Sequence, residues 1–426
     1  MPIERLRVGP DGSAAAVAAR VRTLVPGGES VREPVAGIIA AIVDGGDAAL
    51  ADHVARLDRA TGEDALPIRV ADADLDAAVA ALDPDLRDAL RLAIDNVAAV
   101  ARASCSDDVD VELPQGQRIR VREVPVRRAA VYVPGGRAPY PSTVVMGVAT
   151  ARVAGVDRIV VASPSANPVL HAACRLAGAD EVHRMGGAHA VAALAYGTAT
   201  IDPVDVIVGP GNLWVQEAKR QVAARVGIDG FAGPSDLLVL ADATADPELV
   251  ALDLAAQAEH GTGSLVVLVT DDPGLADDVT ARLRDGVAGG PDAETSGAAY
   301  AVAHVDGAEQ GLEVAEAFAP EHLELVGASM EALASRVRSA GCLFVGPTGA
   351  TAFGDYVVGS NHTLPTDGAA RFASTLSART FRRTMSEVHV GPAADALAAA
   401  GGRIADAEGY VVHAASMRAR QNGGSR

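Results

Sequence analysis

The chain has 426 residues, 49% of them hydrophobic, 21% charged and only 3% aromatic, and this length predicts more than one compact core. Its 36 Lys and Arg residues against 55 Asp and Glu residues give a formal charge of −19, which disfavours nucleic acid and anionic membrane surfaces as partners.

The cysteines and the amino terminus indicate a cytoplasmic protein. Cys105, Cys174 and Cys342 lie far apart and form no CxxC pair, so neither a disulfide framework nor a cysteine zinc site is expected. The first residues, MPIERLRVGPDG, carry charges but no apolar core, and are therefore not a signal peptide. The longest apolar run, PVAGIIAAIV, is about half the ~20 residues that a membrane span requires.

Residues 13–105 are predicted to be helical. Apolar residues recur at helical spacing in SVREPVAGIIAAIV and in DPDLRDALRLAIDNVAAVARA. Ser30 and Asp83 precede these segments and are candidate N-caps.

A different pattern begins near residue 117. Short β-branched runs, namely AAVYV, RIVVA, VDVIV, DLLVLAD and SLVVLVT, alternate with helical stretches of roughly a dozen residues. The alternation forms two blocks, at about 127–234 and 235–350, the second ending in GCLFVGP. Because strands buried on both faces are continuously apolar, the pattern predicts an α/β fold with two parallel sheets.

The pattern changes again after residue 376. A helix, a short strand (EVHV) and a long helix are expected there. A segment this short cannot bury a core of its own, so it should dock on something else.

Glycine-rich turns follow three strands: VPGGRAPYPS, RMGGAHA and VGPGN. Turns of this kind, which open helices, let backbone N–H groups approach a phosphate or another backbone. None matches GxGxxG, so the common dinucleotide fingerprint is absent. Taken alone, the turns are interpreted as tight βα connections without a ligand.

Four pairs of histidine and oxygen-donor side chains lie in short polar segments: Gln257 and His260 in LDLAAQAEH, Glu321 and His322 in APEHLEL, Asp355 and His362 in GDYVVGSNH, and Glu408 and His413 in AEGYVVH. Gln257 and His260 share a helical face if that helix persists. Each residue alone has an ordinary structural explanation, such as a surface histidine or a capping carboxylate. Together they could supply a mixed N/O metal site and an acid–base pair, although spacing alone does not bring them together.

In chain order, the blocks VPGGRAPYPSTVVMG, GGAHAVAALAYGT, VGPGN, GIDGFAGPSD, QAEH, APEHLEL and GDYVVGSNHTLPT resemble the histidinol dehydrogenase family. The resemblance covers about residues 117 to 415, and it is specific because separate blocks agree in order and approximate spacing. It implies NAD-linked oxidation of L-histidinol through histidinal to L-histidine, with one zinc ion per subunit. It also implies a homodimer that exchanges its C-terminal segments.

The resemblance assigns roles to the matching positions: Gln257, His260, Asp355 and His413 as zinc ligands that also contact substrate, Glu321 and His322 as the acid–base pair, Ser235, His362 and Glu408 as further substrate contacts, and Tyr132 and Asn212 as NAD contacts. His322, too, would touch the substrate. One position departs from the family, which usually has Gln where this chain has His189. That position touches the cofactor in relatives, so NAD affinity is the property that the departure affects most.

The implied chemistry suits these residue types. Oxidation of an alcohol to an acid removes two hydrides, so two NAD molecules must bind in turn. His322 can take the hydroxyl proton near neutral pH, and Glu321 is the expected base for adding water to the aldehyde. A zinc ion would anchor the substrate's amine and imidazole, and Glu408 would complement its ammonium. No cysteine is assigned as a nucleophile.

The expected fold is therefore a pair of Rossmann-like, incomplete, doubly wound lobes with small helical terminal segments. An N-terminal arm would span residues 1–24, and the first lobe would combine residues 25–126 with 235–376. The second lobe, on the NAD side, would span residues 127–234, and the C-terminal tail would span residues 377–426.

Two other functions remain open. A relative acting on another amino alcohol or polyol would keep the zinc and the Glu–His pair, but retention of His362 and Glu408 disfavours it. A zinc hydrolase without NAD is disfavoured by the glycine-rich turns and the two blocks.

Overall fold

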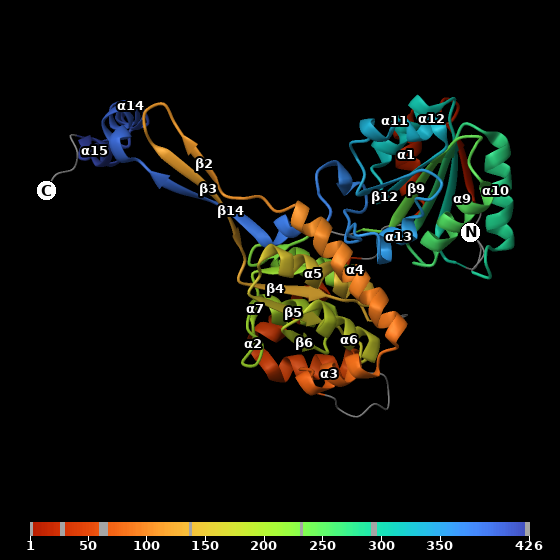
Figure 1. The fold of residues 1–426 in the computed structure, drawn as a ribbon, viewed down its shortest axis with the longest axis horizontal. Helices are drawn as coiled ribbons and strands as arrows, with labels where there is room; N and C mark the ends of the chain where they lie inside the picture. Colours follow the sequence, from red (N-terminus) through yellow and green to blue (C-terminus); the bar gives the residue numbers. More distant parts are fainter. Residues whose placement is uncertain are drawn as a thin grey trace.

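The structure, a computed structural model, describes residues 3–25, 30–58, 67–135, 139–230, 233–290 and 296–421. Two parallel sheets occupy separate lobes, and a narrow antiparallel ribbon leads to a helical pair that stands away from both (Figure 1). The predicted α/β fold with parallel sheets is confirmed. Residues 136–138 and 231–232, within the blocks VPGGRAPYPS and GIDGFAGPSD, lie outside the described residues.

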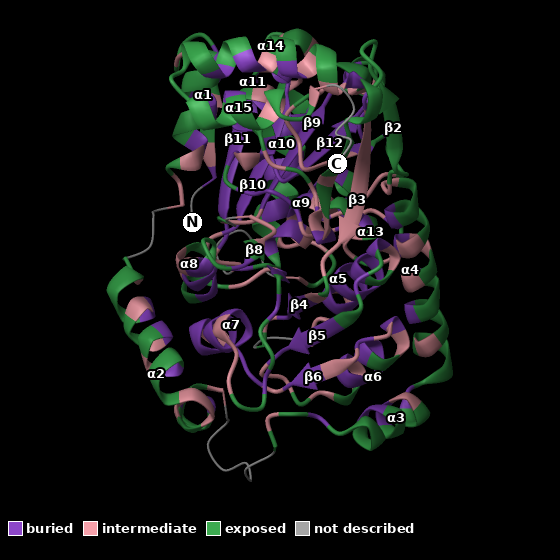
Figure 2. Cartoon of the chain, turned by 90° about the vertical axis from the view of Figure 1, so that its left-hand side faces the viewer, coloured by how far each residue is buried: buried purple, intermediate pink, exposed green. Residues whose placement is uncertain are grey.

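The first sheet has five parallel strands in the order β6-β5-β4-β7-β8. Their bounds are β4 (Arg128–Tyr132), β5 (Arg158–Ala162), β6 (Glu181–His183), β7 (Val206–Val208) and β8 (Gly227–Ile228). The strands predicted in AAVYV, RIVVA and VDVIV are confirmed as β4, β5 and β7. Helices cover both faces, which explains why these strands are apolar throughout (Figure 2).

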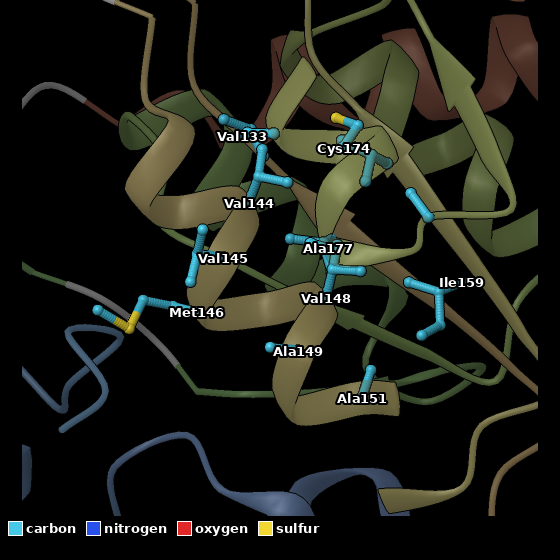
Figure 3. Packing of buried hydrophobic residues seen from close by; sticks show 14 of the residues in the cluster. Val133, Val144, Val145, Met146, Val148, Ala149, Ala151, Ile159, Cys174 and Ala177 are labelled. Atoms are coloured by element: carbon cyan, nitrogen blue, oxygen red, sulfur yellow. The ribbon is translucent and has the colours of Figure 1, made fainter. Parts of the chain in front are cut away.

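One face of this sheet packs on α5 (Pro141–Ala154) and α6 (Pro168–Ala177), and the other on α7 (Gly187–Tyr196) and α8 (Leu213–Val222). Helix α5 is buried along most of its length, because other helices pack against it in addition to the sheet. Figure 3 shows its buried side chains, among them Val144, Val145 and Val148. Gly147 lets α5 approach the sheet closely, since a Cβ there would lie 2.4 Å from a methyl group of Val131.

The N-terminal helices α2 (Arg32–Leu57), α3 (Asp72–Ala81) and α4 (Pro84–Ala103) also belong to this lobe. The apolar side chains of α2 join the cluster of α7 and α8, whereas those of α3 and α4 join that of α5 and α6. Residues 32–103 therefore pack on the sheet formed from 128–228, which differs from the expected grouping of 25–126 with 235–376. Apolar spacing predicted the helices but carried no information about which sheet they cover.

The two proposed N-caps had different outcomes. Asp83 accepts hydrogen bonds from the N–H groups of Asp85 and Leu86, both at 3.0 Å, so its prediction is confirmed. Ser30 is not an N-cap, because α2 starts after Val31 without a side-chain cap.

Among the described residues, α2 alone is long and apolar enough to cross a membrane by length and composition. Its backbone leaves the helical conformation at Gly46 (φ 51°), and Val35, Ile39 and Ile42 are packed in the lobe core.

The second sheet has six parallel strands in the order β1-β11-β10-β9-β12-β13. Their bounds are β1 (Glu4–Arg7), β9 (Asp236–Ala241), β10 (Leu265–Thr270), β11 (Ala299–His304), β12 (His322–Val326) and β13 (Cys342–Val345). Helices α9 (Pro247–Ala258) and α10 (Pro273–Asp285) cover one face, and α1 (Ala14–Arg22) and α11 (Ala308–Phe318) the other. The predicted strands in DLLVLAD, SLVVLVT and GCLFVGP are confirmed, whereas edge strand β1 was not predicted.

Short elements complete this lobe and its connection to the rest of the chain: α12 (Ala328–Glu331), η1 (Ala334–Arg336), α13 (Thr351–Tyr356), η2 (Ala369–Arg371) and η3 (Ala378–Phe381).

The ribbon is a three-stranded antiparallel sheet in the order β14-β3-β2. It consists of β2 (Val109–Glu112), β3 (Arg118–Pro125) and β14 (Arg382–His389), and it leads through η4 (Gly391–Ala393) to α14 (Ala394–Ala407) and α15 (Val411–Arg418). The expected short strand EVHV forms the end of the longer β14. The expected long final helix is two helices, because Gly409 adopts φ +81° between them.

Candidate active site

Four predicted site residues lie at one edge of the second sheet, where β9 and β12 begin side by side. Ser235 immediately precedes β9, Glu321 immediately precedes β12, and His322 is the first residue of β12, paired with Leu237. Parallel neighbours begin at the same edge, so residues that are far apart in sequence meet there. Gln257, in the last turn of α9, reaches the same place by donating from Nε2 to Ser235 Oγ at 2.8 Å.

Glu321 is buried and strongly bound. Its Oε2 accepts hydrogen bonds from Ser235 Oγ at 2.6 Å and from the N–H of Asp236 at 3.0 Å. Burial, followed by the negative charge of Asp236, raises the pKa of Glu321 to about 8, even though both hydrogen bonds favour the ionised form. A carboxylate of this kind can exchange a proton near neutral pH.

Asp236 is a site residue that the sequence analysis missed. Its side chain is fully buried, accepts the N–H of Glu321 at 2.7 Å and forms an ion pair with Arg22 at 2.6 Å. Arg22, at the end of α1, also donates to the carbonyl of Phe318 at 2.8 Å and lies 3.7 Å above its ring. Burial raises the pKa of Asp236, and Arg22 opposes that shift. The only sequence signal was a carboxylate opening an otherwise apolar strand.

The hydrogen bonds of His322 define its tautomer. Nδ1 lies 3.3 Å from the carbonyl oxygen of Asp236, and because a carbonyl can only accept, Nδ1 carries the proton. Nε2 is then the unprotonated nitrogen, and it lies 3.9 Å from Asp355 Oδ1. Burial lowers the pKa of His322 and so favours the neutral ring, against the opposing effect of Asp355.

His362 connects this edge to the other lobe. Its Nδ1 lies 3.0 Å from the carbonyl oxygen of Asp355, and its Nε2 lies 3.2 Å from Thr143 Oγ1, near the start of α5. Burial lowers the pKa of His362 as well. Since α5 follows β4, the amino edge of the second sheet faces the carboxyl edge of the first.

His260 lies just beyond the predicted helical face, because α9 ends at Ala258. Its Nδ1 lies 3.1 Å from the carbonyl oxygen of Gln257, so Nε2 keeps a free lone pair. The Gln257 amide, which donates to Ser235, likewise keeps its oxygen for another partner. These atoms and the Asp355 carboxylate form a donor set that suits zinc. Within the described residues, however, no three His, Cys, Asp or Glu side chains are grouped closely enough to hold a metal ion.

Glu408 and His413 are not brought to this edge within one chain. Glu408 caps α14 and His413 lies on α15, and both are exposed on the part of the chain that projects from the lobes (Figure 1). The ring of His413 stacks on Tyr410 with the centroids 5.0 Å apart.

The three residues assigned to NAD lie near the carboxyl edge of the first sheet. Tyr132 ends β4, and its hydroxyl accepts the N–H of Gly187 at 3.0 Å; burial raises its pKa to about 12. Asn212 is exposed and caps α8 through its side-chain oxygen. His189 is buried on α7, with Nε2 2.8 Å from an Asp58 carboxylate oxygen that also accepts the N–H of Gly186.

Comparisons with known proteins agree on one family. The family model for histidinol dehydrogenase matches residues 26–421. A protein named histidinol dehydrogenase from Parasynechococcus marenigrum is 43% identical to this chain, and the match covers 94% of this chain and 93% of the relative. One of the same name from Rhodospirillum rubrum is 42% identical over 100% of both chains. The crystal structure of histidinol dehydrogenase from Elizabethkingia anophelis, 29% identical, superposes with a TM-score of 0.90 over 98% of both chains.

Proposed function

Because the chain belongs to the histidinol dehydrogenase family, whose members are NAD-dependent oxidoreductases acting on histidinol, we propose that it oxidises L-histidinol through histidinal to L-histidine where β9 and β12 begin. The observation that carries this proposal is the buried carboxyl group of Glu321, bound by Ser235 and Asp236 beside a neutral His322. This arrangement supplies two bases with different proton affinities for two successive oxidations. The enzyme would work in the cytoplasm.

In the first step, His322 would take the hydroxyl proton of histidinol while hydride leaves for NAD. Its Nδ1–H points to the Asp236 carbonyl, which leaves Nε2 as the accepting atom. The lowered pKa of the ring keeps that atom unprotonated near neutral pH. Asp355, near Nε2, would stabilise the imidazolium that forms.

In the second step, Glu321 would take a proton from the water that adds to the aldehyde. Gln257 donates to Ser235, and Ser235 donates to Glu321, so the substrate side of α9 is linked to this base by two hydrogen bonds. The resulting hydrate would lose hydride to a second NAD and its hydroxyl proton to His322, so this ring would act in both steps, and the histidine carboxylate would be released.

NAD would bind at the carboxyl edge of the first sheet. From β4 the chain adds β5 and β6 on one side, and then crosses over to add β7 and β8 on the other side of β4. Open α/β sheets bind ligands at such a switch point, which here lies between β4 and β7. Tyr132 ends β4 and Asn212 opens the helix after β7, so both flank that point. The same order supports the Rossmann-like description of this lobe. Because His189 Nε2 bonds to Asp58, Nδ1 is the ring nitrogen left to face a ligand.

Zinc would be held by Gln257 through its amide oxygen, His260 through Nε2, Asp355 through a carboxylate oxygen, and His413 of a second copy. Bound there, one ion per subunit would supply positive charge that anchors the amine and imidazole of the substrate. The hydrogen bonds that orient His260 and Gln257 are of the kind that fixes metal ligands in place.

A homodimer with exchanged tails would complete the site. The ribbon holds α14 and α15, which carry Glu408 and His413, away from both lobes (Figure 1). This part of the chain exposes large apolar side chains, among them Ile404, Val411 and Val412 at 62%, 69% and 74%. Apolar surface of this kind indicates a protein interface. In the partner's site, Glu408 would face the substrate's ammonium.

The test is a steady-state assay of NADH formation from L-histidinol, with and without a chelator, together with metal analysis of the purified protein. We expect two NADH per histidinol and about one zinc per chain. His260→Ala should lose both the metal and the activity. Full activity in metal-free protein would contradict the zinc assignment, and a single NADH per histidinol would contradict the four-electron reaction.

A further inference from the structure

Two buried charged residues lie beneath the glycine turn that follows β7. Lys219, on α8, is 1% exposed, and the side chain of Asp229, just after β8, is 8% exposed. The Lys219 ammonium group and the Asp229 carboxylate are directly paired. Lysine is rarely buried to this extent, because its ammonium group loses its water, and a buried ion pair is often no more stabilising than apolar residues of the same volume.

Both members of the pair also bind the backbone of Gly209. The Gly209 N–H donates to Asp229 Oδ2 at 2.6 Å, and Lys219 Nζ donates to the Gly209 carbonyl at 3.0 Å. Gly209 lies between the end of β7 and the start of α8. The two side chains therefore bind its N–H and carbonyl groups where no neighbouring strand in the described part of the chain does so. Its φ is +116°, and a Cβ there would lie 2.0 Å from the carbonyl oxygen of Tyr132.

We propose that the Lys219–Asp229 pair is a positioning device for NAD, which holds Gly209 against Tyr132 and thereby fixes the separation of Tyr132 and Asn212 before the cofactor binds. The inference rests on the assignment of NAD to this edge. A turn fixed in advance loses no conformational entropy on binding, so the pair acts on cofactor affinity. Within the part of the chain that the structure describes, the hydrogen bonds of both side chains go to each other and to Gly209, and none goes to a residue proposed to bind or transform histidinol.

The test compares two double variants in the full-length enzyme. Lys219→Met with Asp229→Asn removes both charges together, so no unpaired buried charge remains. The control, Arg128→Met with Glu181→Gln, removes a 3.3 Å ion pair with side chains 21% and 15% exposed at the opposite edge of the same sheet. NAD binding is followed by the fluorescence of Trp214, the single tryptophan of the chain, which lies two residues after Asn212.

We expect the first double variant to raise the Kd and the KM for NAD about tenfold or more, equivalent to ~1.4 kcal/mol. The KM for histidinol and the kcat at saturating NAD should stay within about twofold, and the control should change neither constant. If the double variant does not fold, Lys219→Arg keeps the charge but changes its shape and should raise the same two constants. Unchanged NAD constants in a folded variant, or an equal rise in the control, overturn the inference.

A third variant separates this inference from the proposed function. Asn212→Asp keeps the oxygen that caps α8 but adds a negative charge at a proposed contact with NAD, whose diphosphate is itself anionic. If it weakens NAD binding while the Lys219/Asp229 variant does not, the positioning role alone has failed. If Asn212→Asp leaves the KM for NAD unchanged, and NAD does not alter Trp214 fluorescence in the wild-type enzyme, the NAD assignment has failed too.

Discussion

Three groups of Asp236 orient the two proposed bases. Its N–H donates to the Glu321 side chain, its carboxylate accepts the Glu321 N–H, and its carbonyl lies beside His322 Nδ1. Arg22 compensates the buried charge. The N-terminal helix α1 therefore supports the geometry of a site to which it contributes no reacting group.

The pH dependence of the second oxidation should report Glu321. To act as a base, this carboxyl group must lose its proton, so the rate should rise with pH through about 8. Asp236→Asn removes the negative neighbour that helps to raise the pKa, and the inflection should move to lower pH. The measurement is the kcat for histidinal oxidation against pH. A shift to higher pH would contradict the assigned electrostatics.

The two oxidations should also respond differently to loss of each base. Glu321→Gln keeps the shape but cannot take a proton, so histidinal oxidation should slow by about 10²-fold or more while alcohol oxidation changes less. His322→Ala should slow both steps. Single-turnover rates with histidinol and with added histidinal measure the two effects. Equal and small losses in both variants would argue against these roles.

At the scale of elements, β12 and α9 meet through two carboxyl groups. Glu324 shares the His322 face of β12 and is 2% exposed, and it contacts Asp253, one turn before Gln257 on α9. Burial and the charge of Asp253 raise the pKa of Glu324 to about 9, so the pair shares a proton near neutral pH. The contact between β12, which begins with His322, and α9, which carries Gln257, therefore includes a shared proton.

Glu324→Gln should therefore stabilise the protein, and more so at alkaline pH. An acid whose pKa is higher in the folded state keeps its proton there while the unfolded chain has lost it. Stability consequently falls as the pH rises from the ordinary value of 4.5 to about 9. The Gln amide can donate a hydrogen bond to Asp253 at any pH, whereas Glu324 can do so only when protonated. The melting temperature of the variant at pH 8 should therefore exceed that of the wild type by ~2 °C or more. An equal gain at pH 5 would contradict the proton-sharing explanation.

At the scale of the whole molecule, the projecting ribbon holds α14 and α15, which carry Glu408 and His413, away from both lobes (Figure 1). If the tails are exchanged in a two-fold dimer, each site takes Gln257, His260 and Asp355 from one copy and His413 from the other. Two inactive variants should then complement each other.

The experiment co-expresses His260→Ala with His413→Ala. In a mixed dimer with exchanged tails, one site carries both lesions and the other carries neither. Random pairing makes half of the dimers mixed, so about a quarter of wild-type activity should return. Tails that fold back on their own chain leave one lesion in every site, and no activity would return. Each variant expressed alone is the control.

The sequence by itself determined the parallel sheets and the candidate bases. Strands buried on both faces must be continuously apolar, and runs such as AAVYV and DLLVLAD carry that requirement locally. Glu321 and His322 were candidates because they are adjacent in a short polar segment, and the resemblance to the family assigned them as the acid–base pair. The sequence predicted one ribbon strand in part, as EVHV in β14, but missed β2 and β3. The mixed charged and apolar residues of RIRVREVP form strand β3 only when β14 and β2 pair with it.

Only the tertiary structure decided which sheet the N-terminal helices cover. In the same way, it decided that Arg22 pairs with the buried Asp236, and that Lys219 pairs with Asp229 beneath Gly209. It also decided that the amino edge of one sheet faces the carboxyl edge of the other, through His362 and Thr143. Most of these contacts join residues that are distant in sequence. Local periodicity records which face of an element is apolar, whereas the partner of a buried charge is determined only when the elements pack.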